Sequence, residues 1–232
     1  MSAPSIRARV RAEITEEIKA AARRHLAADG ANLSLRAVAR DMGMVSSALY
    51  RYFASRDELL TALIIDAYNS IGAAVEAADA GVARGDLRRR WYAICHAVRD
   101  WALANPAEYA LIFGSPVPGY AAPRDTIGPA SRTPIALVAI LVDGVAAGTL
   151  STPDRPPAPE SLRTDAARLR DSTFPGVPED LLILGMVGWI HLFGAVSFEL
   201  FGQLNNAINA RREAFGHQMR LMADMIGLPE PA

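Results

Sequence analysis

A short run of polar side chains between residues 46 and 52 carries the groups that most clearly suggest chemistry. Ser46, Ser47 and Arg51 supply two hydroxyls and a guanidinium, and Tyr50 and Tyr52 add two phenols. Hydroxyls bind phosphates and base edges, and Arg forms paired hydrogen bonds with guanine. We expect Ser46, Ser47 and Arg51 to contact DNA bases, and the two tyrosines to contact the DNA backbone.

These side chains need a rigid support, and residues 35–53, LRAVARDMGMVSSALYRYF, predict one. Ala39 is small enough for two helices to cross closely, and Gly43 suits a turn that requires a positive φ. The apolar residues that would close a small core between the helices are Val38, Met42, Met44 and Leu49. The pattern predicts a helix-turn-helix whose second helix presents its N-terminal residues to the major groove. A helical hairpin that only packs is the alternative.

The segment ALYRYFASRDELL at 48–60, following AVARDMGM at 37–44, resembles the N-terminal domain of TetR/AcrR-type transcriptional regulators. The resemblance covers about residues 10–77. It implies a three-helix DNA-binding head, a fourth helix that links to an all-α effector domain, and a homodimer on a double-stranded DNA operator. The positions that match DNA-contacting places of the family are Ser34, Arg36, Ser47, Tyr50, Tyr52 and Arg56.

Val45 departs from the family pattern, which often has a Ser or Thr there as the N-cap of the recognition helix. A Val side chain cannot accept a hydrogen bond from the first N–H groups, and the loss is about 1 kcal/mol. Ser46 and Ser47 are the neighbouring residues that could replace this cap.

The charge distribution fits a selective DNA-binding protein better than a general polyanion binder. The 232 residues carry a formal net charge of only −1, and 51% of them are hydrophobic. Residues 1–60 hold 10 Lys and Arg against 7 Asp and Glu, whereas the remainder holds 14 against 18. A mildly basic head on an acidic body would not coat DNA indiscriminately. Arg7, Arg9 and Arg11 form a short basic arm ahead of the first predicted helix.

Apolar periodicity predicts helices throughout and no strands, so the expected fold is all-α: a three-helix helix-turn-helix head followed by an antiparallel helical ligand-binding and dimerisation domain. We place the DNA-binding domain at residues 1–55, a linking helix at 56–78 and the second domain at 79–232. Helices are expected at about 10–28, at 87–113 with a break at Asn105-Pro106, at 135–150, at 179–201 and at 205–226. Ser55 and Glu58 form a capping box before the linking helix. Residues 151–161 contain four prolines and predict a loop.

The run LLILGMVGWIHLFGAVSF at 181–198 contains no formal charge over 18 residues. His191 and Ser197 lie within it and no Lys or Arg cluster flanks it, which favours burial between the domain core and a subunit interface over a membrane span. In the family that the chain resembles, the last two helices form a four-helix dimer interface. The region around Trp189 also resembles the WHG variety of C-terminal domain, although the order of its Trp, His and Gly residues is altered.

Catalytic and metal-binding patterns do not emerge from the sequence. His25, His96, His191 and His217 are scattered, and neither GxSxG, HExxH nor a Gly-rich phosphate loop occurs. Cys95 is the only cysteine, which favours a core residue over a disulfide or a cysteine-based zinc site. We expect no enzyme, no cofactor and no metal. The N-terminus has no apolar signal segment, which predicts a cytoplasmic location and no membrane partner.

Large aromatic residues in the second domain suggest a small-molecule cavity with a few polar anchors. The expected effector pocket comprises Trp91, His96, Trp101, Phe113, Asp143, Trp189 and His191. The sequence thus predicts a ligand-responsive regulator: a repressor that binds a palindromic operator as a homodimer and is released by a small, mostly apolar effector. The alternatives are an all-α small-molecule-binding protein or enzyme with the helix-turn-helix as scaffold, and an activator or a regulator without an effector.

Overall fold

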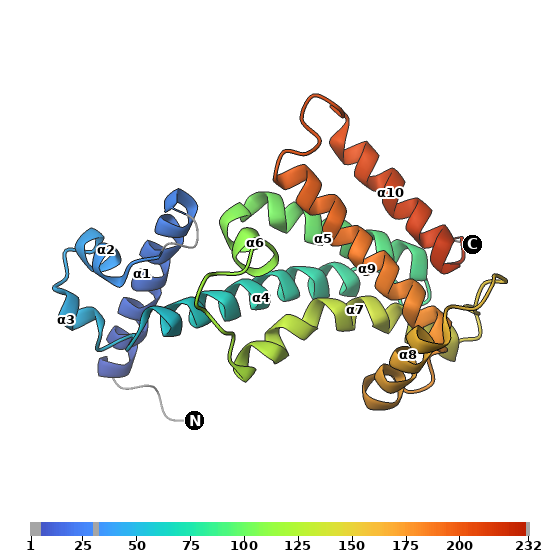
Figure 1. The fold of residues 1–232 in the computed structure, drawn as a ribbon, viewed down its shortest axis with the longest axis horizontal. Coiled ribbons are helices and arrows are strands. Elements are labelled where there is room, and N and C mark those ends of the chain that lie inside the picture. Colours follow the sequence, from blue (N-terminus) through green and yellow to red (C-terminus); the bar gives the residue numbers. More distant parts are fainter. Residues whose placement is uncertain (1–5, 30–32, 231–232) are drawn as a thin grey trace. The chain divides into compact units, whose positions relative to one another are not determined.

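Helices make up all of the regular structure in the computed structural model, which describes residues 6–29 and 33–230. No strand occurs in this part of the chain, and the predicted all-α fold is confirmed. Figure 1 shows the helices in chain order. Their bounds are α1 Ile6–Asp29, α2 Leu35–Asp41, α3 Ser46–Leu49, α4 Arg56–Ala80, α5 Leu87–Ala104, α6 Pro106–Phe113, α7 Ile127–Ala146, α8 Glu160–Thr173, α9 Glu179–Leu200 and α10 Arg211–Ile226, with a short 3-10 turn, η1, at Arg124–Thr126.

The described chain packs as two compact units. Unit 1 contains the described residues up to Ser70 together with Asn105–Ala130, and unit 2 contains Ile71–Ala104 and the described residues from Ser131 onward. The segment 105–130 therefore packs with the N-terminal residues, although the expected second domain, residues 79–232, includes it. Helix α4 contributes its first part to unit 1 and its last part to unit 2.

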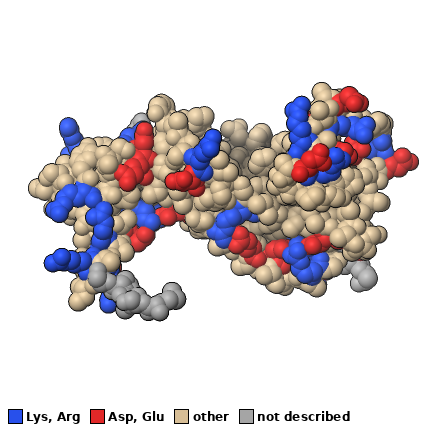
Figure 2. All heavy atoms as spheres, turned by 90° about the horizontal axis from the view of Figure 1, so that it is seen from below, with Lys and Arg blue, Asp and Glu red and all other residues tan. Residues whose placement is uncertain are grey.

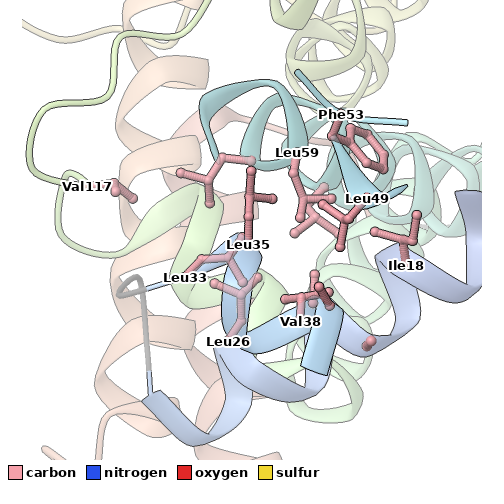
Figure 3. Close-up of a cluster of buried hydrophobic side chains, with 14 residues drawn as sticks. Ile18, Leu26, Leu33, Leu35, Val38, Leu49, Phe53, Leu59 and Val117 are labelled. Carbon is pink, nitrogen blue, oxygen red and sulfur yellow. The ribbon is translucent and has the colours of Figure 1, made fainter. Parts of the chain in front are cut away.

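The core of unit 1 joins the first four helices through a cluster of aliphatic side chains and Phe53. Figure 3 shows these residues converging between α1, α2, α3 and the start of α4, with Val117 from the loop after α6 nearby. The predicted contacts of the helix-turn-helix are present, because Val38, Ala39 and Leu49 are buried and Met42 and Met44 pack against them. Burial of this kind supplies about 1.5–3 kcal/mol for each large aliphatic side chain.

The first helix begins earlier than the sequence predicted. Arg7, Arg9 and Arg11 are the first-turn and second-turn residues of α1, so the expected basic arm ahead of the helix is wrong. Arg and Ala are good helix formers, and nothing in IRARVRAE breaks a helix. The three guanidinium groups are therefore carried on a helix rather than on an extended segment.

Two helices that follow α6 differ from the prediction. Helix α7 begins at Ile127 rather than near residue 135, and it contains Pro134 in its interior. Helix α8 was not predicted, because it directly follows a proline-rich segment that predicts a loop. Its amphipathic pattern was nevertheless legible: Leu162, Ala166 and Leu169 recur at helical spacing after Glu160.

The C-terminal pair of helices, α9 and α10, is confirmed, but α10 begins at Arg211 rather than near residue 205. Gly202 and Asn206 have φ values of 79° and 63°, in the left-handed region, so no helix can run through them. Figure 1 shows α9 and α10 as an antiparallel pair.

Three stretches of the described chain are long and apolar enough to cross a membrane by length and composition: Arg56–Ala80, Arg124–Ala146 and Glu179–Leu200. In the last of these, 39% of the apolar window is buried within the single chain. The part of α9 that packs on the domain core is therefore buried, while a stripe of apolar residues at its surface remains exposed in the single chain. The residues on this stripe are Val187, Ile190, Phe198 and Phe201.

Candidate functional site

The turn of the helix-turn-helix has the geometry that its residues predicted. Ser34 caps α2, since its Oγ accepts a hydrogen bond from the Ala37 N–H at 3.4 Å. Gly43 has a φ of 65°, the left-handed conformation that a glycine adopts without strain. Val45 is the N-cap residue of α3 and makes no side-chain capping bond. The departure seen in the sequence thus leaves the N-terminal end of the recognition helix without a side-chain cap.

The capping box after α3 is confirmed in a shifted form. Ser55 Oγ accepts a hydrogen bond from the Glu58 N–H at 3.1 Å, which caps the start of α4. Glu58 Oε2 accepts from the Ala54 N–H at 2.5 Å, one residue before the position of an ideal box. These bonds fix the loop that joins α3 to α4.

The residues expected to contact DNA lie mostly at the surface of unit 1. The exposed ones are Ser34, Arg36, Ser47, Tyr50 and Arg51, and the half-buried ones are Ser46, Tyr52 and Arg56. Arg56 donates from Nε to the Leu33 carbonyl at 3.1 Å and lies 3.5 Å from the Asp57 carboxylate. Part of its guanidinium therefore ties α4 to Leu33, two residues before the start of α2. On the face shown in Figure 2, Lys and Arg side chains gather over the N-terminal end of the molecule.

A contact that the sequence reasoning missed involves Arg11 of α1. Its Nη2 donates to the Arg51 carbonyl at 3.0 Å, and its guanidinium carbon lies 5.1 Å from the centre of the Tyr52 ring. The arginines at 7, 9 and 11 suggested only a basic segment. Arg11 and Arg51 are 40 residues apart in sequence, and no local sequence pattern indicates a contact between them.

Unit 2 contains a cavity of about 350 Å³ whose walls are almost entirely apolar. Trp91 of α5 and Trp189 of α9, two of the residues expected at an effector pocket, both line this cavity. Trp91 Nε1 donates to the Met219 carbonyl at 2.9 Å, so its polar atom is satisfied and its ring is free to act as a wall. The other lining residues are Ser131, Pro134, Ile135, Leu137, Val138, Ile140, Leu141, Leu169, Thr173, Phe174, Leu182, Gly185, Met186, Ile226 and Leu228.

The other five residues expected at the pocket are placed elsewhere. Phe113 belongs to unit 1, where the centre of its ring lies 5.9 Å from the centre of the Tyr68 ring and 5.1 Å from that of the Tyr109 ring. His191 Nε2 lies 3.1 Å from Gln218 Oε1, and Trp101 is buried in α5 without lining the cavity.

The rings of His96 and Phe215 pack edge to face, with their centres 5.3 Å apart. The buried Nδ1 of His96 has no hydrogen-bond partner. Burial lowers the pKa of His96, the nearby Arg212 lowers it further, and Asp100 opposes the shift. The guanidinium groups of Arg99 and Arg220 act in the same direction as Arg212.

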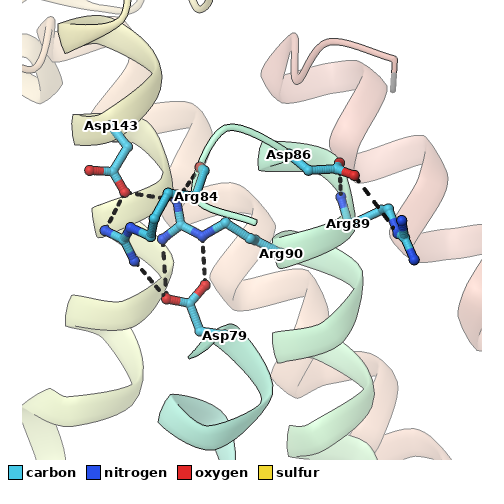
Figure 4. A network of polar contacts seen from close by, with 6 residues as sticks. All are labelled: Asp79, Arg84, Asp86, Arg89, Arg90 and Asp143. Carbon is cyan, nitrogen blue, oxygen red and sulfur yellow. Dashed lines mark hydrogen bonds and ion pairs between the residues drawn. The ribbon is translucent and has the colours of Figure 1, made fainter. Parts of the chain in front are cut away.

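Asp143, the fifth of these residues, belongs to an ion-pair network rather than to the pocket (Figure 4). Arg90 is fully buried and donates to Asp79 Oδ1 at 2.7 Å and to Asp143 Oδ2 at 2.7 Å. Arg84 also bonds to both carboxylates. Burial lowers the pKa of Arg90, but the bonds to the two carboxylates outweigh it and raise that pKa. This network joins the end of α4 to α5 and α7.

A second ion pair joins α4 and α7 within unit 2. Arg132 donates from Nε and Nη2 to the two carboxylate oxygens of Glu76, at 2.8 Å and 2.6 Å. The bond from Arg132 lowers the pKa of Glu76. Paired hydrogen bonds of this kind fix the relative orientation of the two side chains. Helix α7, which supplies most of one cavity wall, is thus bound to α4 directly through Arg132 and Glu76, and indirectly through Arg84 and Arg90, which bridge Asp143 to Asp79.

Among the described residues, no group of three or more His, Cys, Asp and Glu side chains could hold a metal ion. Cys95 is fully buried, and burial raises the pKa of its thiol well above the usual range. It therefore lacks the thiolate character that metal binding or nucleophilic attack requires.

Comparisons with known proteins agree with this arrangement. Residues 18–63 match the family described as bacterial regulatory proteins, tetR family, and residues 91–222 match the description tetracyclin repressor-like, C-terminal domain. An HTH-type transcriptional regulator of Mycobacterium bovis is 42% identical over 196 residues, which cover 83% of this chain and 83% of that protein. A regulator of Mycobacterium tuberculosis matches with the same identity and coverage.

Solved structures show the same fold. The crystal structure of the regulatory protein SCO4313 superposes with a TM-score of 0.75 at 36% identity, covering 96% of this chain and 100% of that chain. The TetR family regulator PfmR of Thermus thermophilus shares the fold, with a TM-score of 0.59 at 20% identity over 92% of this chain and 99% of that chain. The helix-turn-helix, the two matched domains and these relatives together show that the chain belongs to the TetR family of helix-turn-helix transcriptional regulators and is not an enzyme.

Proposed function

We propose that this TetR-family regulator is a cytoplasmic repressor that binds a palindromic operator as a homodimer and leaves it when a small, mostly apolar effector binds. The observation that carries the proposal is the apolar cavity in unit 2, in a chain whose unit 1 exposes the polar residues of a helix-turn-helix. The proposed division of labour keeps DNA binding in residues 1–55, linkage in 56–78 and effector binding and dimerisation in 79–232.

The exposed stripe on α9 supports the homodimer. Val187, Ile190, Phe198 and Phe201 are each between 40% and 60% exposed in the single chain, on a helix next to the C-terminal helix α10. Such a stripe is costly in water and is covered most simply by its own copy about a two-fold axis. A two-fold dimer would also present two recognition helices to a palindromic operator.

The composition of the cavity supports an uncharged effector. Its walls contain no charged side chain, and the polar side chains that line it are the hydroxyls of Ser131 and Thr173. A charged ligand would lose its hydration without finding a counter-ion, which is strongly unfavourable. An apolar molecule with one or two hydrogen-bonding groups matches these walls.

The ion pairs between α7 and α4 support the switch. Ser131, Pro134, Leu137 and Leu141 of α7 line the cavity, and Arg132 and Asp143 of the same helix are bound to the α4 side. A ligand that displaces α7 would therefore act on α4, which also contributes residues to unit 1. It reduces operator binding only by binding the DNA-incompetent arrangement more tightly. A hundredfold effect on operator affinity corresponds to about 2.7 kcal/mol of coupling.

A screen that follows tryptophan fluorescence and operator release together tests this proposal. Uncharged apolar compounds should quench the wild type and release its operator duplex. Trp189→Phe should reduce the fluorescence response and leave the part that comes from Trp91, which also lines the cavity, whereas Trp101→Phe, a matched control outside the cavity lining, should preserve the full response. Compounds that quench Trp189 but never alter DNA binding would contradict the switch and favour a regulator whose cavity has no regulatory role.

A further inference from the structure

The recognition helix α3 is short and poorly fixed at its N-terminal end. It contains only four residues, Ser46–Leu49, and its N-cap residue Val45 makes no side-chain capping bond. The Val45 side chain is 70% exposed, so packing does not hold it firmly either. The orientation of α3 therefore depends strongly on contacts at its other end.

Arg11 supplies such a contact at the C-terminal end. The residues after α3 form a tight turn, in which the Arg51 N–H donates to the Ala48 carbonyl at 3.2 Å and the Tyr52 N–H donates to the Leu49 carbonyl at 2.8 Å. The Arg51 carbonyl accepts the bond from Arg11 at 3.0 Å. Carbonyl groups at the end of a helix lack internal partners, and a cation there is favourable.

The same guanidinium also holds the next side chain. It lies over the half-buried Tyr52 ring at 5.1 Å, a cation–π contact worth about 0.5–1 kcal/mol at an exposed site. One side chain of α1 thus binds the backbone of Arg51 and the ring of Tyr52. Tyr50 and Arg51, which are expected to contact DNA, extend from this turn.

We propose that Arg11 is a positioning residue for DNA recognition: it fixes the C-terminal end of α3 so that Tyr50 and Arg51 meet their bases and phosphates in one geometry. The alternative is that Arg11 binds a phosphate directly, as an exposed cation on the DNA-binding unit. The two roles differ in their dependence on salt. A phosphate contact releases counterions and contributes about 0.9 to the slope of log affinity against log salt, whereas a positioning residue contributes nothing to that slope.

Arg9 provides a matched control, because it is an exposed cation on the same helix, two residues away. The variants are Arg11→Ala, Arg11→Gln, which keeps a neutral donor for the Arg51 carbonyl, and Arg9→Ala. Two DNA probes are needed: a duplex enriched from a random library by the wild-type protein, and a random-sequence duplex of equal length. Dissociation constants are measured over a series of salt concentrations.

We expect Arg11→Ala to weaken binding to the enriched duplex about tenfold, to change binding to the random duplex less than about twofold, and to leave the salt slope unchanged. Arg11→Gln should recover part of the affinity although it lacks the charge. A slope reduced by about 1, with equal losses on both duplexes, would assign Arg11 to a phosphate and overturn the proposal. Unchanged affinity for both duplexes would overturn it as well.

A measurement without DNA separates this proposal from the operator proposal on which it rests. Amide hydrogen exchange in residues 46–53 of the free protein should accelerate in Arg11→Ala and remain unchanged in Arg9→Ala, because only Arg11 holds the turn. Exchange in α10 serves as the internal reference for global stability. Equal exchange in wild type and Arg11→Ala would overturn the positioning role, whatever the protein does on DNA.

Discussion

Replacing Phe198 with Glu should convert the proposed dimer into monomers. Phe198 is 57% exposed in the single chain and lies on the same stripe of α9 as Ile190. Fully burying a Phe side chain is worth up to about 3 kcal/mol, so covering its exposed part is worth about 1.7 kcal/mol. A two-fold interface contains this residue twice, and the substitution removes about 3.4 kcal/mol, or about 300-fold in the dimer dissociation constant. Desolvation of the new carboxylates adds to this loss.

Light scattering and sedimentation, from nanomolar to micromolar protein, measure this change. The matched control is Ile127→Glu, which introduces the same charge at a residue of unit 1 that is 61% exposed. The control should dimerise as the wild type does, and Phe198→Glu should lose specific DNA binding together with dimerisation. A Phe198→Glu protein that dimerises with the wild-type dissociation constant would refute the placement of the interface on α9.

Substitutions at Gly194 test the same stripe of α9 by comparing an uncharged side chain with a charged one. A Cβ added at this exposed residue meets no atom within 4 Å, so larger side chains fit the single chain. Gly194→Ala and Gly194→Arg should both favour the helix, by up to about 1 kcal/mol. Only the Arg variant places a charge on the apolar face, and only it should yield monomers. Monomers from Gly194→Ala as well would point to a backbone effect instead of an interface.

Three further predictions concern DNA contact, the cavity and pH. Arg51→Ala should weaken operator binding by about 1–3 kcal/mol, measured by fluorescence anisotropy, with little change in the thermal midpoint because Arg51 is exposed. Gly185→Leu should fill part of the cavity beside Leu141 and abolish effector-induced quenching, while operator affinity stays within about twofold of wild type; full quenching would place the effector elsewhere. The pKa of His96 is lowered from 6.5 by burial, so the unfolded chain binds its proton more tightly than the folded protein does. The free energy of unfolding should therefore fall as the pH drops below about 6.5, and urea titrations should show a weaker fall in His96→Gln.

The helix-turn-helix was predictable because its signals are local. Gly43 must adopt a positive φ, and Ser34 and Ser55 must cap helices, so each of these requirements depends on residues within about one helical turn. Val38 and Leu49 are buried on the two helices that the turn joins, and they lie only 11 residues apart. The missing cap at Val45 was legible for the same reason.

The cavity was predictable only in part, because it depends on contacts between distant helices. Trp91 and Trp189 line it. Trp101 is an equally large aromatic residue on the same helix as Trp91, yet it lies in the core. Asp143 looked like a polar anchor of a pocket and instead neutralises the buried Arg90, 53 residues away in sequence. The sequence carries no local mark that separates these roles.

The errors in element bounds have similar causes. The helix expected over residues 135–150 in fact begins at Ile127 and continues through Pro134, since one missing hydrogen bond is offset by packing of the helix in unit 2. The prolines at 153–159 predict a loop, and the amphipathic pattern of α8 begins directly after them, so this helix was missed. Phe113 was expected at the effector pocket as one of the large aromatic residues that could form its walls, but it packs against Tyr68 in unit 1.

Selection from a random DNA library with the purified wild-type protein tests sequence-specific DNA binding by a homodimer. We expect that the enriched duplexes share an inverted repeat, that one dimer binds each duplex, and that cutting the repeat to one half-site lowers affinity by at least about 100-fold. No enrichment of any sequence, or tight binding of a monomer to a single half-site, would contradict it.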